Sequence, residues 1–195
     1  DLPRLLFRLV LGKRLPITTG ELQIPGLHAP ITIRRNKWGV PAIEAENDRD
    51  AAFALGFCHG QDRAGQLEVY LRVGRGRLAE WVGKAGLPTD RMSRRLGFRR
   101  ASEKQLTAIS PELRLVLQAY AFGVNAGHSD GLSTKPHEFA ILGGEPTAWD
   151  AADVLGVLKL QSFSLPSNWD LELARLQLLR SDGPAAVREL DPLGH

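Results

Sequence analysis

The chain has 195 residues, of which 43% are hydrophobic, and its 25 Lys and Arg residues exceed its 22 Asp and Glu residues by three. This length and hydrophobic content predict a folded, globular chain with a substantial core and exclude an intrinsically disordered one. A net charge of +3 is too small for a nucleic-acid-binding surface, and no apolar run reaches the length of a membrane span, so we expect neither partner.

The first 46 residues divide into a predicted helical arm and a predicted strand region. Over residues 1–20, leucines at helical spacing alternate with basic residues, which indicates a short amphipathic helix that packs on the core or on another subunit; a membrane-surface helix is the alternative. Over residues 21–46, short runs of alternating hydrophobic and polar residues predict strands. Because prolines interrupt these runs, we expect an edge hairpin that also pairs with another sheet.

Residues 47–195 are predicted to be mostly helical. Asn47 or Asp48 can cap a long helix that ends at the glycines near residue 76, and a shorter segment follows. Ser110 followed by Pro111 is typical of a helix start, and this second long helix is expected to stop before a turn-rich segment.

The last third of the chain begins with a stretch, residues 129–149, whose glycines and prolines predict an ordered loop. Asp150 can cap the next helix, which Pro166 ends. A further helix is expected over residues 168–180, and a short one starts at Gly183.

The order of these elements predicts a single α-rich α+β domain over residues 1–195, because strands and helices do not alternate as in a parallel α/β domain. No dinucleotide-binding, Walker-type or zinc-binding spacing is present. Cys58 is expected to be a small buried hydrophobe and not a catalytic partner of His59, because neighbours on a helix point in different directions. A Ser/His/Asp triad assembled only by the fold stays an open alternative.

Several longer strings stand out because they occur together in a fixed order. They are WGVPAIEA (38–45), DAAFALGFCHGQDR (50–63), QLE (66–68), GRGRLAE (74–80), EFAILG (138–143) with Pro146 and Trp149, and SNWDLEL (167–173). This ordered set resembles the α subunit of the penicillin acylase family, which includes acylases for β-lactams and for N-acyl homoserine lactones. The resemblance extends over residues 30–180.

Members of that family are N-terminal nucleophile hydrolases, made as one precursor that cuts itself into an α chain and a larger β chain. The resemblance therefore implies an αββα sandwich completed by the β chain, and a nucleophile that is the N-terminal serine of that chain. It implies that no catalytic residue lies in the present chain. The implied substrate is a small acyl amide, a penicillin or an N-acyl homoserine lactone, hydrolysed through an acyl-enzyme.

The resemblance also assigns residues to the site. One wall of the acyl pocket maps to four residues that precede Pro166, namely Leu160, Ser162, Phe163 and Ser164. The alternative for Phe163 is an ordinary core position.

Many family members hold a calcium ion with one carboxylate of the α chain, for which Glu172 is preferred over Asp170 here. A tryptophan stands at the directly matching position, and a solvated carboxylate at a helix start is the alternative. No organic cofactor is implied. The family implies a periplasmic or secreted protein, and the rival function is that of a non-catalytic helical binding or adaptor subunit.

Overall fold

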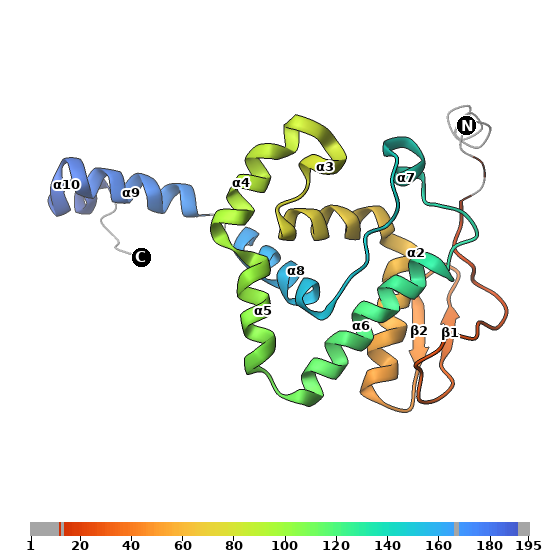
Figure 1. Cartoon of the computed structure of the whole chain (residues 1–195). Coiled ribbons are helices and arrows are strands. Elements are labelled where there is room, and N and C mark those ends of the chain that lie inside the picture. The colour runs from red at the N-terminus through yellow and green to blue at the C-terminus, as the bar shows by residue number, and fades with distance from the viewer. Residues whose placement is uncertain (1–11, 13, 166–167, 191–195) are drawn as a thin grey trace. The chain divides into compact units, whose positions relative to one another are not determined.

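The computed structural model of the chain describes residues 12, 14–165 and 168–190 (Figure 1). Its packing divides the chain after Leu158 into two compact units. The single domain expected over the whole length stays a prediction. Among the described helices, none combines the length and the hydropathy needed to cross a bilayer.

The predicted N-terminal helix falls mostly on residues 1–11 and 13, which lie outside the described residues. Its last part is not helical. Pro16 forms an isolated antiparallel bridge with Leu132, and the backbone N–H of Ile17 donates to the carbonyl of Gly131 at 2.9 Å. Hydrogen bonds to a distant segment thus replace the local ones that a helix would need over this stretch.

The predicted hairpin is confirmed. Strand β1 (Thr32–Arg35) pairs antiparallel with β2 (Pro41–Glu44), which begins at a proline and so loses no interior hydrogen bond. In the connecting turn, the Asn36 side chain accepts hydrogen bonds from the backbone N–H groups of Trp38 and Val40. In the described part of the chain the sheet has these two strands, and pairing with another sheet stays a prediction.

Helix α2 (Asp48–Arg75) confirms the first long helix. Asn47 caps it by accepting a hydrogen bond from the Asp50 N–H at 2.9 Å, and Gly76, with φ 66°, ends it in the left-handed region. Arg63 has non-helical dihedrals, so α2 bends into the two arms visible in Figure 1.

Helix α6 (Pro111–Ser129) packs along α2, and glycines allow the close approach. They are Gly56 and Gly60 on α2 and Gly123 and Gly127 on α6. A Cβ on Gly56 would lie 2.1 Å from the carbonyl oxygen of Tyr120, and one on Gly123 would lie 2.0 Å from that of Phe53. The two backbones are therefore in direct contact, and no side chain larger than hydrogen fits at these positions.

The hydrophobic core lies against this pair of helices in two clusters. Leu67, Leu71, Ala121, Val124 and Trp149 form one, and Phe53, Phe57 and Ala126 form the other. The hairpin side of the molecule contributes Ile31 and Ile33 to the second cluster.

Within the mostly helical region expected over residues 47–195, no individual helix is delimited from the sequence between residues 83 and 109, and the structure has two there. Helix α3 (Ala79–Val82) and a 3-10 turn over 83–86 lead into α4 (Leu87–Leu96) and α5 (Phe98–Ala108). The apolar periodicity is weak there, because the buried positions of α4 are Asp90 and Ser93. Asp90 ties α4 to the start of α3 by accepting hydrogen bonds from the N–H groups of Leu78 and Ala79.

The predicted loop over residues 129–149 also contains a helix, α7 (His137–Leu142). Its buried Phe139 packs on Trp81, with ring centroids 5.3 Å apart, so a distant aromatic stabilises a helix too short to form alone. The remaining predicted helices are confirmed as α8 (Ala151–Ser164), α9 (Trp169–Ser181) and α10 (Gly183–Leu190).

Candidate functional site

The first half of α8 is anchored in the first unit by charged groups. Asp150 caps the helix by accepting hydrogen bonds from the N–H groups of Ala152 (2.8 Å) and Asp153 (3.1 Å). The carboxylate of Asp153, 1% exposed, binds Arg75 at 2.6 and 2.8 Å and Arg99 at 2.7 Å. Burial works against the charge of Arg99, but the hydrogen bonds that its guanidinium donates to carboxylates raise its pKa, so Arg99 stays charged.

The four residues predicted to form the acyl-pocket wall lie in the second half of α8. Leu160 is buried, Phe163 is half-buried, and Ser162 and Ser164 are exposed. At 3.6 residues per turn, the side chains of Leu160, Phe163 and Ser164 share one face, while Ser162 lies about 200° around the helix from Leu160. The structure therefore brings three of the four together.

Ser164 closes α8 with a hydrogen bond from its hydroxyl to the carbonyl of Gln161 at 2.9 Å. The next residue, Leu165, is 82% exposed. The proline that was expected to break the helix, Pro166, lies outside the described residues. The aromatic side chain of Phe163 and the aliphatic side chain of Leu165 thus lie at the C-terminal end of α8 and just beyond it.

The predicted calcium ligand, Glu172, lies in the first turn of α9. Its carboxylate is exposed and pairs with Arg175 at 2.7 Å, and the exposed Asp170 accepts a hydrogen bond from the N–H of Leu171. Over residues 12, 14–165 and 168–190, no cluster of three or more potential metal ligands occurs. Because calcium takes about six to eight oxygen ligands, the described residues alone do not make a calcium site.

The strings that carried the family resemblance supply buried structural groups. Glu68, with an exposed fraction of 0%, accepts hydrogen bonds from the backbone N–H of Thr147 at 2.8 Å, from its hydroxyl at 2.6 Å and from Arg72. Gln61 donates to the carbonyls of Ile17 and Gly131 at 2.8 and 2.9 Å. These side chains hold loops on α2. Their structural hydrogen bonds explain their residue types without a catalytic role.

The neighbouring Cys58 and His59 do not act as a pair. Cys58 is buried, and burial raises the pKa of its thiol, which disfavours a reactive thiolate. Nδ1 of His59 lies 2.8 Å from the hydroxyl of Tyr120 on α6. Burial lowers the pKa of His59, so a neutral imidazole joins the two helices, and Cys58 fills the small buried space that the sequence predicts for it.

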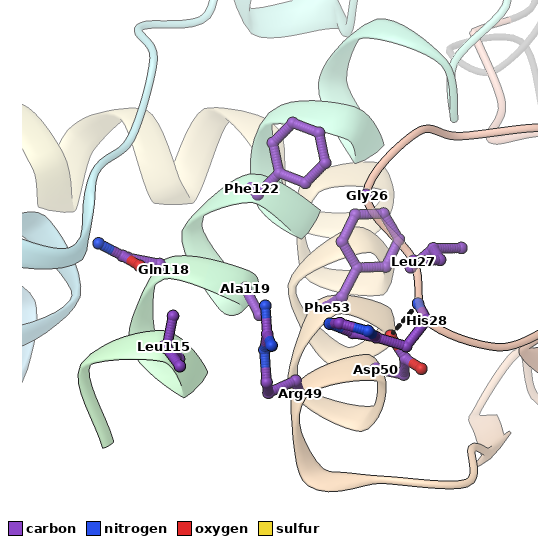
Figure 2. Close-up of a pocket in the computed structure, with 10 residues that line it drawn as sticks. All are labelled: Gly26, Leu27, His28, Arg49, Asp50, Phe53, Leu115, Gln118, Ala119 and Phe122. Atoms are coloured by element: carbon purple, nitrogen blue, oxygen red, sulfur yellow. Dashed lines mark hydrogen bonds between the residues drawn. The ribbon is translucent and has the colours of Figure 1, made fainter. Parts of the chain in front are cut away.

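A cavity that no sequence pattern predicts lies between α2, α6 and the loop before β1 (Figure 2). Its volume is ≈170 Å³, and its lining comes from three segments that are far apart in the chain: Gly26, Leu27, His28, Arg49, Asp50, Phe53, Leu115, Gln118, Ala119 and Phe122. The rings of Phe53 and Phe122 lie 5.7 Å apart, centroid to centroid. Because the fold alone assembles this lining, no local motif announces it.

Asp50 fixes one side of this cavity. Its two carboxylate oxygens accept hydrogen bonds from the N–H groups of His28 and Ala29, both at 3.1 Å, and from the Asn47 amide at 2.7 Å. Burial by itself raises the pKa of Asp50, but the hydrogen bonds from His28, Asn47 and Ala29 outweigh it and lower the pKa below its ordinary value. The loop is therefore held on the first turn of α2 by an ionised carboxylate.

Comparison with known proteins gives concordant results. The penicillin amidase family model matches residues 30–194. The chain is 37% identical over 183 residues to the penicillin acylase 2 proenzyme of a Pseudomonas species, covering 94% of this chain and 23% of that protein. It is 38% identical over 178 residues to the acyl-homoserine lactone acylase QuiP of Pseudomonas aeruginosa, covering 91% of this chain and 21% of that protein.

Among solved structures, a thermostable penicillin G acylase from Alcaligenes faecalis matches with a TM-score of 0.66 and 23% identity, over 83% of this chain and 88% of that chain. That similarity concerns the fold. The chain spans only 21 to 23% of the length of the two curated relatives. On the family match and on the identity to both relatives, the chain belongs to the penicillin amidase family.

Proposed function

We propose that this chain is the α-type part of an acylase that hydrolyses the amide bond between an apolar acyl group and an amine-bearing head group. The observation that carries the proposal is the family match over residues 30–194, together with relatives named as penicillin acylase and acyl-homoserine lactone acylase. Penicillins and N-acyl homoserine lactones are accordingly the two proposed substrate classes.

In this proposal the reactive serine belongs to a larger β chain from the same precursor, and the acyl group passes through an ester on that serine. The hairpin β1–β2 and the surrounding helices join the αββα sandwich that the β chain completes. The buried polar groups of the signature strings support this division of labour, because Asp50, Gln61 and Glu68 are already engaged in structural hydrogen bonds.

The proposed docking surface for the β chain includes α9. Its large apolar side chains are exposed: Trp169, Leu171, Leu173, Leu176 and Leu179. A helix that keeps so many leucines in water would lose free energy relative to one that buries them, at roughly 25 cal/mol for each Å² of apolar surface. Burial against the rest of the protein removes that cost.

The acyl wall is the part of the proposal that this chain can test directly. Phe163 and Leu160 offer an apolar face, and each acyl methylene that it buries contributes about 0.8 kcal/mol to binding. Replacing Phe163 by Ala should enlarge the space and shift the preferred acyl chain length, measured as kcat/KM over a series of acyl amides. Leu165→Ala, at an exposed position two residues further along, is the matched control; an unchanged length profile for Phe163→Ala would refute the wall.

Calcium stays a proposal in which Glu172 provides one carboxylate and the other oxygen ligands come from outside the described residues. No step of the proposed hydrolysis depends on it, and no organic cofactor is proposed. The measurement is the metal content of the purified protein, which Glu172→Gln should lower without removing the chain from the complex. A periplasmic or secreted location is proposed from the family resemblance.

The rival proposal, a non-catalytic adaptor, is favoured by the same exposed leucines of α9. The acylase and adaptor proposals require different subunit compositions. The acylase requires a second, larger chain that begins with serine and is present at one-to-one stoichiometry, which intact mass measurement and N-terminal sequencing of the purified protein detect. A protein that carries this chain without such a partner and hydrolyses no acyl amide would favour the adaptor.

A further inference from the structure

The cavity of Figure 2 combines aromatic and aliphatic walls with a positively charged group that has no ion-pair partner among the described residues. Phe53, Phe122 and Leu115 supply aromatic and aliphatic walls, and Arg49 extends from the first turn of α2 into the space that faces α6. Nε of Arg49 is buried and makes no hydrogen bond. No described residue forms an ion pair with this guanidinium.

The one acidic side chain in the lining does not neutralise Arg49. Both oxygens of Asp50 are directed at the backbone N–H groups of His28 and Ala29 and at the amide of Asn47. An unpaired, partly buried guanidinium is costly, and a planar carboxylate is the partner that matches its geometry best.

The size of the cavity limits what can accompany the carboxylate. A dry cavity of about 150 Å³ lined by Leu, Ile and Phe side chains is known to accept benzene. The ≈170 Å³ here therefore has room for one small ring or a short alkyl chain, with the charged end at Arg49 and the polar edge formed by His28 and Gln118.

From this combination we infer that the cavity between α2, α6 and the 26–28 loop is a binding site for a small carboxylic acid with a compact apolar body. Arg49 binds the carboxylate, and Phe53 and Phe122 pack on the apolar part. The cavity shares no lining residue with the proposed acyl wall on α8, and its assignment does not rest on the proposed hydrolysis.

The test uses the purified protein and 4-fluorobenzoate, followed by ¹⁹F NMR. We expect a bound signal at the cavity that is lost in Arg49→Gln, which removes the charge, and in Ala119→Leu, which fills the space. Arg91→Gln removes an exposed arginine outside the cavity and should leave the signal. The uncharged 4-fluorobenzamide should bind this site at least about tenfold more weakly, because charge-assisted hydrogen bonds are the stronger ones.

Three outcomes would overturn the inference. They are the absence of a bound signal that depends on Arg49, equal binding of the acid and the amide, and a bound signal that Ala119→Leu leaves unchanged. Thermal unfolding of each variant shows that a lost signal is not a lost fold. Loss of acylase activity has no bearing on this readout, so failure of the inference and failure of the proposed function are distinguishable.

Discussion

The two long helices of the first unit and helix α9 of the second differ in how they satisfy their surfaces. Between α2 and α6 the backbones touch at glycines, and the buried carboxylates of Glu68 and Asp153 beside them have partners within the chain. Along α9 the leucines are exposed and the ion pair of Glu172 lies at the surface. The first region is stabilised by contacts within this chain, whereas the second exposes an apolar surface that suits contact with another polypeptide segment.

The largest loss of stability is expected from a substitution at the glycine contact between α2 and α6, and it tests whether that contact stabilises the first region. Gly123→Val should destabilise the fold by about 3 kcal/mol or more, because its Cβ would overlap the carbonyl of Phe53 and force the helices apart. The measurement is the free energy of unfolding in urea. Gly74→Ala is the matched control: the nearest atoms to its Cβ lie 3.9 Å away, so that variant should be neutral or more stable.

A smaller but still large effect is expected at the buried carboxylate that anchors α8. Asp153→Asn should lower the free energy of unfolding by about 2 kcal/mol, since it leaves Arg75 and Arg99 without their shared partner while both retain some solvent. Glu172→Gln, which breaks an exposed pair, should cost about 0.5 kcal/mol or less. Equal losses in chemical denaturation would contradict the contrast drawn between the two regions.

Asp50 should make the stability of the first region depend on pH. Its folded pKa lies below the ordinary 3.8, so its contribution to stability is complete above that value and is lost as the pH falls through the lower folded pKa. Asp50→Asn should therefore be less stable by about 1 kcal/mol at neutral pH, and the difference should narrow on acidification. Unfolding curves taken from neutral pH downward check this, and a gap that stays constant would show that the carboxylate is not the cause.

The smallest effect on stability is expected on α9. Leu176→Ser should change the free energy of unfolding by about 0.5 kcal/mol or less, because this side chain is already exposed. The same change should weaken co-purification of the proposed β chain. Ser181→Ala, at the polar end of the helix, serves as the control; a large loss of stability for Leu176→Ser would mean that the leucine packs within this chain.

Where structure depends on neighbours in sequence, prediction from the sequence succeeds. Asn47, Gly76 and Ser110 mark helix ends, and each acts there through hydrogen bonds within one turn. The same local reasoning misses α7, which depends on the packing of Phe139 against Trp81. Of the proposed acyl wall, helical spacing predicts that Leu160 and Phe163 share a face, but their burial is set by the fold.

By itself, then, the sequence determined the family, the α-rich class, the hairpin and most helix boundaries, because caps, periodicity and ordered motifs are short-range information. The tertiary structure alone decided that α4 and α5 form in an arginine-rich stretch, that the signature carboxylates are structural, and that Arg49 faces a cavity beside Phe53. These features arise where segments distant in the chain meet, and the free energy of burying a charge or leaving it unpaired depends on that meeting.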